Sequence, residues 1–324
     1  MEQRLTIGKK NARQALERFC TGHDEIVFVT GGSSYGLCGA KLFFDDFFAS
    51  YPSVKLTRLV VSGANPKVEI VQSLLEKISD GVKAFVVVGG GTVIDTAKLL
   101  NLAVVSGISI KKLLSQKINV ESLLPSMIFP TTAGTGAEAT RFAVCYDGGV
   151  KCSVDLEAIR PSDVVIIPEF TNTLPVYQKL LTNFDAYAQA VESLWARGAT
   201  DESRKYANRA LALMEENNWP EASYWAGKAI DISRTTAAHA LSYHLTSHYG
   251  IPHGHAVYMV FEYICRNNNQ FEYIKRVPGL MSLGEFAAEK GIEWGKLIDD
   301  LFAHVNLARL GNNPVEVRKE SFNV

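Results

Sequence analysis

Histidine is concentrated in one short segment of the chain. Residues 239–255 read HALSYHLTSHYGIPHGH and hold five of the seven histidines among 324 residues. Because imidazole is a common metal ligand and a poor core residue, this crowding predicts a metal site. We expect a helix through His239 and Tyr243 that stops at the Gly-Ile-Pro sequence, followed by a tight turn that carries His253 and His255.

A segment further upstream could supply the remaining metal ligands. Residues 183–193 have the pattern of a helix, on which Asp185 and Gln189 are four residues apart and therefore project from one face. With His239 and His253, a carboxylate and an amide oxygen could hold a metal that keeps an open position for a substrate oxygen. In the simpler alternative, Asp185 caps the helix and Gln189 is a surface or polar core residue.

Two glycine-rich loops indicate a nucleotide site. The strand-like run 84–88 leads directly into GGGTVIDTAK, and the apolar run 127–129 leads into PTTAGTGAE. Bare backbone amides at a helix start can approach a pyrophosphate closely. The alternative is that the glycines only form a tight turn. We predict cofactor contacts from both loops, at Gly89, Gly90, Gly91, Thr92, Asp95, Thr131, Thr132 and Thr135.

The periodicity of apolar residues changes once along the chain. It predicts an α/β nucleotide-binding domain with a parallel sheet over residues 1–170 and an all-helical metal and substrate domain over residues 171–324, with the active site in the cleft between them. Strands are expected at 26–30, 56–61, 84–88, 127–129 and 164–167. Helical segments are expected at 66–79, 179–195, 201–216, 222–248 and 292–304.

Composition limits the classes of function. With 47% apolar residues, 21% charged residues and a formal net charge of −1, the chain has no basic surface for nucleic acid. It has no run approaching the roughly 20 apolar residues of a membrane span, and its first ten residues have no apolar core. The five cysteines form no paired motif and predict reduced thiols in the cytoplasm.

Four motifs carry a family resemblance. GGGTVIDTAK, PTTAGTGAEAT, DAYAQAVES and HALSYHLTSHYGIPHGH, in this order, resemble the iron-containing (group III) alcohol dehydrogenases, whose wider superfamily includes dehydroquinate synthase. The resemblance spans about residues 28–315 and implies that Asp185, Gln189, His239 and His253 bind a divalent metal, Fe²⁺ or Zn²⁺. Gln189 stands where the usual ligand is histidine. Tyr243 also stands where many members carry a histidine close to the nicotinamide.

Further segments resemble one branch of that family, the phosphonoacetaldehyde reductases, which form 2-hydroxyethylphosphonate. These segments are GSSY at 32–35, ATRFAV at 139–144, ISRTTAA at 232–238 and RLGNNPV at 309–315. A phosphonate would require cations, so we expect Arg141, Arg234 and His244 to bind the substrate. The alternative is that these arginines are solvated surface residues.

The expected reaction is transfer of a hydride from NADPH or NADH to a small aldehyde. Gly31 ends a strand where relatives selective for NAD carry an acidic residue, and Ser33 or Ser34 could donate to a 2′-phosphate, which favours NADPH. The alternative is a turn glycine and NADH. We also predict a cofactor contact from Lys151 and catalytic roles for His255 and Tyr243, although His255 could instead only order its turn.

Other functional classes remain open from sequence alone. These are an ordinary short-chain alcohol dehydrogenase, a lyase similar to dehydroquinate synthase, and a nucleotide-binding relative whose site has decayed at Gln189. The loops match the dehydrogenases better than the cyclases, and Asp185, His239 and His253 are all retained, which disfavours the last two classes. The partner is expected to be a small aldehyde or alcohol, with no nucleic acid or membrane, and a homodimer is compatible with the sequence.

Overall fold

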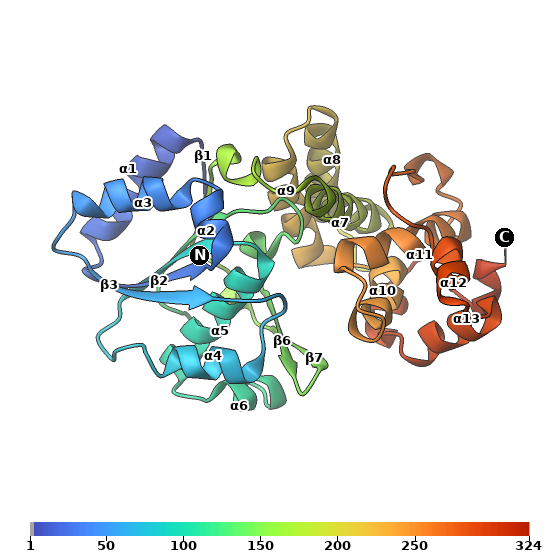
Figure 1. The fold of residues 1–324 in the computed structure, drawn as a ribbon, viewed down its shortest axis with the longest axis horizontal. Helices are drawn as coiled ribbons and strands as arrows, with labels where there is room; N and C mark the ends of the chain where they lie inside the picture. Colours follow the sequence, from blue (N-terminus) through green and yellow to red (C-terminus); the bar gives the residue numbers. More distant parts are fainter. Residues whose placement is uncertain (1–2, 324) are drawn as a thin grey trace. The chain divides into compact units, whose positions relative to one another are not determined.

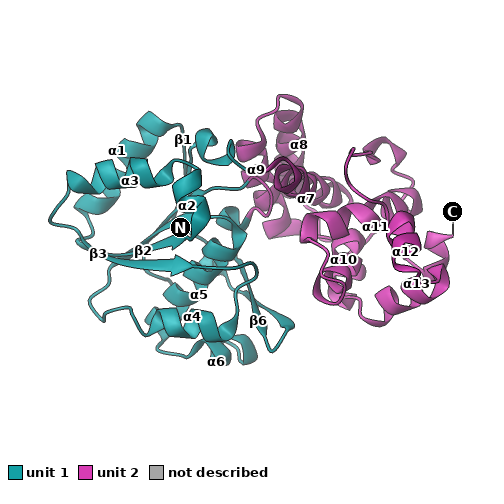
Figure 2. Cartoon of the chain, in the orientation of Figure 1, with its two compact units in different colours: residues 1–132, 137–174 teal, residues 133–136, 175–324 magenta. Residues whose placement is uncertain are grey.

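The computed structural model describes residues 3–323, which form two compact units (Figure 2). Unit 1 comprises the described residues up to Thr132 together with Ala137–Leu174. Unit 2 comprises Ala133–Gly136 and the described residues from Pro175 onward. The short segment Ala133–Gly136 thus belongs to the helical unit although its neighbours in sequence belong to the other one.

Unit 1 is built on a parallel sheet, as the sequence predicts. In the described part of the chain the sheet has six strands in the order β1-β8-β5-β4-β2-β3. The strands are β1 (Arg4–Ile7), β2 (Glu25–Gly31), β3 (Lys55–Val61), β4 (Ala84–Gly89), β5 (Ser126–Pro130) and β8 (Asp163–Ile166). Strand β1 and an antiparallel hairpin of β6 (Phe142–Asp147) and β7 (Val150–Asp155) were not expected. β1 is a four-residue edge strand with little apolar pattern, which explains why it escapes a search by periodicity.

Alternate residues of the central strands face two different cores. Val27 and Val29 of β2 point into one apolar cluster, and Ile26 and Phe28 point into the other, because side chains alternate across a strand. Helices cover both faces of the sheet (Figure 1). One face carries α1 (Lys9–Thr21), α2 (Ser33–Leu37) and α3 (Ala40–Ala49), and the other α4 (Val68–Leu75), α5 (Gly91–Ser106) and α6 (Ile110–Ser115). Short 3-10 turns are η1 (Ala137–Ala139), η2 (Glu157–Ile159) and η3 (Pro168–Thr171).

Unit 2 is helical throughout its described residues, as expected. Its helices are α7 (Val176–Trp195), α8 (Asp201–Glu215), α9 (Trp219–Ser233), α10 (Ala237–Ser247), α11 (His253–Asn267), α12 (Leu283–Lys290), α13 (Trp294–Ala303) and α14 (Leu307–Leu310), with 3-10 turns η4 (Phe271–Tyr273) and η5 (Lys319–Phe322). One apolar cluster, drawn mainly from α7 and α9 to α13, forms its core. Buried alanines of this core, such as Ala186 in α7 and Ala256 in α11, are small enough to let these two helices pack closely.

Two local expectations for unit 2 are wrong. The run 222–248 is not one helix, because α9 ends at Ser233 and Arg234 adopts a left-handed φ of 64° before α10 begins at Ala237. His253 to His255 do not form a tight turn but the first turn of α11, which starts directly after Pro252. In both places, hydrogen bonds and close contacts to other elements override the local pattern, as shown below.

All five cysteines are free thiols, in agreement with the expectation from sequence. Among residues 3–323, no helix combines the length and the apolar character that crossing a membrane requires.

Candidate functional site

Helix α7 presents three polar side chains along one buried face. Asp185, Gln189 and Glu192 are separated by four and three residues, which places them on the same side of a helix. Their exposed fractions are only 3%, 3% and 0%. Burying two carboxylates is costly unless positive groups or hydrogen-bond donors meet them, so the surroundings of α7 must supply such partners.

Two histidines from the following helices reach Asp185. His239 Nε2 lies 3.2 Å from Asp185 Oδ1, and His253 Nε2 lies 3.8 Å from the same oxygen. One ligating atom of each of the three residues lies within 4.8 Å of the others. The side chain of His253 is 33% exposed, whereas those of Asp185 and His239 are 5% and 4% exposed. The cluster is therefore buried on one side and accessible on the side of His253.

A glycine allows His253 to come this close. A Cβ atom on Gly254 would lie 2.1 Å from the carbonyl oxygen of Leu181, which is one helical turn before Asp185 in α7. No other residue fits this contact without moving one of the helices. Gly254 therefore fixes the start of α11 against α7, and His253, the preceding residue, is held beside Asp185.

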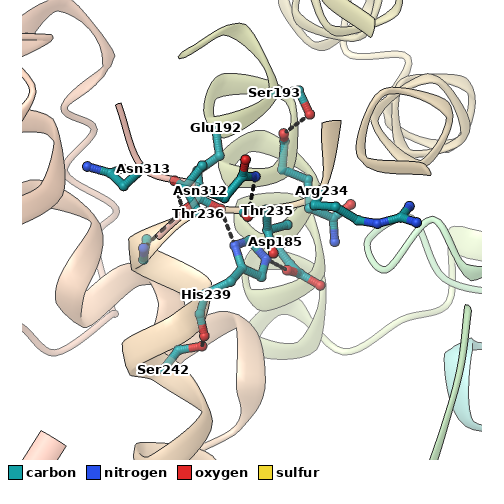
Figure 3. Close-up of polar contacts among 12 residues, drawn as sticks. Asp185, Glu192, Ser193, Arg234, Thr235, Thr236, His239, Ser242, Asn312 and Asn313 are labelled. Carbon is teal, nitrogen blue, oxygen red and sulfur yellow. Dashed lines mark hydrogen bonds and ion pairs between the residues drawn. The ribbon is translucent and has the colours of Figure 1, made fainter. Parts of the chain in front are cut away.

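Glu192 orients His239 through Nδ1, the ring nitrogen that does not face Asp185 (Figure 3). Its carboxylate accepts hydrogen bonds from His239 Nδ1, from the Thr236 hydroxyl at 2.7 Å and from the Ala238 backbone N–H at 2.9 Å. Burial alone would lower the pKa of His239, but the charge of Glu192 and the hydrogen bonds to Asp185 and Glu192 raise it to about 10. Two buried carboxylates thus create a strongly negative potential that favours a cation at this point.

The same interactions explain why α9 and α10 are separate helices. Asn312 donates from Nδ2 to the carbonyl oxygens of Ser233 at 2.9 Å and Thr235 at 3.0 Å, and its Oδ1 accepts from the backbone N–H of Gly198 at 2.9 Å (Figure 3). The carbonyls at the break between α9 and α10 therefore find partners outside the helix. This turn delivers Thr236 and the start of α10 to Glu192.

The side chains present fit a divalent metal. The Oε1 atom of Gln189 is buried with no hydrogen-bond partner, while Gln189 Nε2 donates to the Thr135 carbonyl oxygen at 3.4 Å. A buried carbonyl oxygen without a partner is costly and is satisfied if it binds a cation. Asp185, Gln189, His239 and His253 together offer two oxygens and two imidazole nitrogens, a set suited to Zn²⁺ or Fe²⁺. A second carboxylate behind a ligating histidine, as with Glu192, is the usual support of such a site.

The other predicted residues of this segment divide into two groups. Tyr243 stacks on His253 with ring centroids 5.9 Å apart, so it lies beside the group of candidate metal ligands. His255 is buried, with Nδ1 2.9 Å from the Tyr177 hydroxyl and Nε2 2.9 Å from the Met281 backbone. Both of its ring nitrogens are engaged, which favours the structural alternative for His255. The structure does not bring His244 to this cluster, since its Nε2 lies 2.8 Å from Asp300 Oδ2.

The glycine-rich loops of unit 1 lie at one edge of the sheet. Gly89 pairs with Pro130 at the carboxyl ends of β4 and β5, and the Thr131 N–H donates to the Gly89 carbonyl oxygen at 3.1 Å. A Cβ on Gly89 would lie 2.4 Å from Val93 Cβ, and one on Gly90 would lie 3.0 Å from Thr132. Gly89 thus leaves room for Val93 in the first turn of α5, and Gly90 lets the two loops pack closely, at the sheet edge where nucleotides bind in such folds.

The predicted cofactor residues occupy different places around this edge. Gly91 and Thr92 form the start of α5, whose N-terminal amides can bind an anion, and Gly31 ends the adjacent strand β2. Ser33 and Ser34 begin α2, where Ser34 Oγ would lie 2.3 Å from a Cβ on Gly31. Thr135 belongs to unit 2, where its carbonyl oxygen contacts Gln189.

A charged cluster lies beneath these loops. Sequence reasoning predicted Asp95 and Lys151 of this cluster as cofactor contacts and missed Lys98. Lys98 is 4% exposed and donates to the carbonyl oxygens of Ala137 at 2.6 Å, Thr140 at 2.7 Å and Phe142 at 2.7 Å. Burial raises the pKa of Asp95 to about 6, although Lys98, the Val144 N–H at 3.1 Å and Lys151 all favour its charged form. Asp95 and Lys98 thus bind the glycine-rich loop and its helix to strand β6. The lysine at the end of the GGGTVIDTAK motif was the feature of the sequence from which this role could have been predicted.

The two predicted substrate arginines lie in different units. Arg141, in unit 1, forms ion pairs with Asp155 at 3.0 Å and Glu157 at 3.3 Å. Arg234, in unit 2, donates from Nη1 to the Asp231 carbonyl oxygen and lies two residues before Thr236 in the turn that supports His239. Sequence reasoning missed two supporting residues, Glu192 and Asn312. Only Glu192 had a recognisable position, because it continues the Asp185 and Gln189 face of α7.

A glycine-rich nucleotide loop on a parallel sheet, combined with a buried carboxylate and imidazole cluster on a helical unit, is typical of metal-dependent dehydrogenases. Residues 3–168 match the family model for iron-containing alcohol dehydrogenase, and residues 215–320 match the C-terminal model of the same family. The chain belongs to the iron-containing alcohol dehydrogenase family, as its motifs predict.

The individual relatives of this chain are only distantly similar to it in sequence. The chain is 31% identical to phosphonoacetaldehyde reductase from Streptomyces viridochromogenes over 208 residues, which are 57% of the chain and only 53% of that enzyme. It is 26% identical to 4-hydroxybutyrate dehydrogenase from Clostridium kluyveri, over 78% of the chain and 74% of that enzyme. A crystal structure of an iron-containing alcohol dehydrogenase from Thermotoga maritima superimposes with a TM-score of 0.82 at 25% identity, covering 99% of this chain and 96% of that one.

Replacing Glu192 by glutamine tests its support of His239. The substitution keeps the shape but removes the buried negative charge that favours a cation, so we expect the affinity for Zn²⁺ to fall about 10- to 100-fold. Competition with a chromophoric chelator measures this affinity. Glu289→Gln, on the exposed surface of α12, is the matched control and should leave it unchanged. Equal affinities of the two variants would show that Glu192 does not act on the metal site.

Proposed function

We propose that this protein catalyses the metal-dependent, NAD(P)H-linked reduction of a small aldehyde to a primary alcohol. The observation that carries the proposal is the unpartnered, buried Oε1 of Gln189 beside the cluster of Asp185, His239 and His253. In a relative that had lost its catalytic activity, we would not expect this cluster and the supporting residue Glu192 to remain intact. Membership of the iron-containing alcohol dehydrogenase family supports the same reaction class.

The residues of unit 2 would hold the metal and leave one side open to the substrate. The ion would polarise the carbonyl oxygen of the aldehyde as a Lewis acid, and the reduced nicotinamide would supply the hydride. Asp185 and His239 are buried and contact each other, and Glu192 holds His239 from its other ring nitrogen, so their geometry is set before the substrate binds. Tyr243, stacked on the partly exposed His253, would flank the open side and exclude water from it.

We infer that the cofactor binds at the sheet edge of unit 1. The glycine contacts between Gly89, Gly90 and Thr132 and the N-terminus of α5 support a pyrophosphate site. NADPH is favoured because Gly31 offers no carboxylate at the end of β2 and because the hydroxyl of Ser34 lies directly beside it. A hydroxyl donor at this point suits a 2′-phosphate.

We further propose that the aldehyde carries an anionic group, as phosphonoacetaldehyde does. Two relatives described above are named for substrates that carry a phosphonate or a carboxylate. Arg234 is the stronger candidate to bind this group, because it belongs to the turn that supports His239. The ion pairs of Arg141 with Asp155 and Glu157 partly neutralise its charge.

The metal site is tested by replacing His253 with alanine. The variant should lose the bound divalent ion, measured by elemental analysis after loading and dialysis, and should lose NAD(P)H oxidation with every aldehyde tested. His23→Ala, a histidine replacement in unit 1, is the control and should retain both. An active His253→Ala enzyme with unchanged metal content would refute the proposed site.

The cofactor preference is tested at Gly31. An aspartate there should reduce kcat/KM for NADPH relative to NADH by about tenfold, which corresponds to roughly 1.4 kcal/mol of like-charge repulsion with the 2′-phosphate. Because any Cβ at this position meets Ser34 Oγ at 2.3 Å, Gly31→Ala is the necessary control for the steric effect alone. If aspartate and alanine change the NADPH to NADH ratio equally, the adenosine ribose does not bind at this strand end.

The anionic substrate is tested at Arg234. Charge-assisted hydrogen bonds contribute roughly 1.5 to 3 kcal/mol each, so Arg234→Gln should lower kcat/KM for phosphonoacetaldehyde by about one to two orders of magnitude and affect neutral acetaldehyde far less. Arg276→Gln, whose side chain is 81% exposed, is the control. If the unmodified protein uses neutral aldehydes as well as phosphonoacetaldehyde, it is an ordinary short-chain alcohol dehydrogenase instead.

A further inference from the structure

Two histidines that the proposed active site does not use, His244 and His304, form a cluster with Asp300. His244 lies in the last turn of α10, and Asp300 and His304 lie at the end of α13. His244 Nε2 is 2.8 Å from Asp300 Oδ2, and His304 Nδ1 is 3.3 Å from Asp300 Oδ1. One ligating atom of each of the three residues lies within 4.8 Å of the others, as in the cluster around Asp185.

We propose that His244, Asp300 and His304 form a second site for a divalent transition-metal ion such as Zn²⁺ or Ni²⁺, separate from the site around Asp185. Two neutral imidazoles and a carboxylate are a set that such ions bind well. Metal–nitrogen bonds of about 2.0 Å require ligating atoms roughly 3.3 Å apart, which is near the distances of Asp300 to both histidines.

The rings of this cluster are stacked, so binding of an ion requires one of them to move. His304 and His244 stack with centroids 4.2 Å apart and an interplanar angle of 5°, and His248 stacks on the other face of the cluster at 4.9 Å from His244 and 8°. His244 and His248 are four residues apart on one chain segment, and so are Asp300 and His304. The lone pairs of ring nitrogens lie in the ring planes, so two parallel rings do not point at one ion. His304 must therefore rotate out of the stack to bind an ion together with His244 and Asp300.

The surroundings also favour a cation. Both residue pairs lie at helix C-termini, where the helix dipole and the last carbonyl groups create a negative potential. Tyr249 donates its hydroxyl proton to Asp300 Oδ2 at 2.8 Å and fixes this carboxylate. Asp300 and His244 are mostly buried, whereas the side chain of His304 is 57% exposed, so it can exchange its hydrogen bond to the Asp300 backbone carbonyl at 3.0 Å for an ion.

A metal at this site would join the end of α10 to α13 immediately before the turn that leads to His253. The expected role is structural, since an ion that binds only the folded state stabilises it in proportion to its concentration above the dissociation constant. A proton shared between an imidazole and Asp300 is the competing description of the cluster. In that case the cluster is a hydrogen-bonded surface network and no ion binds.

Metal stoichiometry distinguishes the two descriptions. The full chain, stripped by chelator and titrated with Zn²⁺ in a calorimeter, should bind two equivalents, His304→Ala should bind one, and His253→Ala should keep the equivalent at His304. His23→Ala should bind two and controls for the loss of a histidine elsewhere. A His253→Ala protein that binds no ion, or a His304→Ala protein that binds as many equivalents as the wild type, would overturn the proposal.

Thermal unfolding provides a second readout that does not depend on activity. Zn²⁺ should raise the Tm of His253→Ala, in which only the second site remains, and should not raise the Tm of the double variant His253→Ala with His304→Ala. Because His304 is exposed, removing it should leave the Tm without metal unchanged. Equal shifts in the two proteins would exclude the site, whatever the outcome for the catalytic proposal.

Discussion

The burial of Asp185 and Glu192 on one face of α7 is the constraint on which the rest of unit 2 depends. Two carboxylates this deeply buried require cations and donors on every side, because an unpaired buried charge costs several kcal/mol. His239 lies between them and has its pKa raised to about 10 against the effect of burial, mainly by Glu192. Asn312 donates to two carbonyl groups at the break between α9 and α10. This break places the Thr236 hydroxyl and the Ala238 N–H beside Glu192. The fold around this helix is therefore organised to hold positive charge at one point.

A second requirement of the structure is that backbone segments approach each other closely, and glycine allows this. Gly254 brings α11 against Leu181 and so places His253 beside Asp185, and Gly90 lets two loops meet closely at the sheet edge. In each case a single Cβ would separate the elements that carry chemistry. Both units thus use glycine in the same way, in unit 2 at the proposed cation site and in unit 1 at the proposed pyrophosphate site. Beneath the glycine-rich loop of unit 1, Lys98 donates hydrogen bonds to carbonyl oxygens, and its charge favours the ionised form of Asp95.

Much of this architecture could be predicted from the sequence, because strand and helix periodicity and the glycine motifs are local signals. The parallel sheet, the helical second unit and the grouping of Asp185, His239 and His253 follow from such signals. The interruption at Arg234 could not be predicted, because it depends on Asn312, which lies 78 positions further along the chain. His244 shared the segment of the metal ligands but points to Asp300, since five residues after His239 a helix presents a different face. Glu192 was predictable in principle, as the next position on the face defined by Asp185 and Gln189.

The central claim is that α7, α10 and α11 bind one divalent metal through two imidazoles and two oxygens. X-ray absorption at the metal edge of the His304→Ala protein, loaded with one equivalent of Zn²⁺ or Fe²⁺, tests this most directly because only the Asp185 cluster is then available. The account predicts a first shell of light atoms at about 2.0–2.2 Å with the outer-shell scattering of two imidazole rings. A first shell that contains sulfur, or one without imidazole scattering, would contradict it.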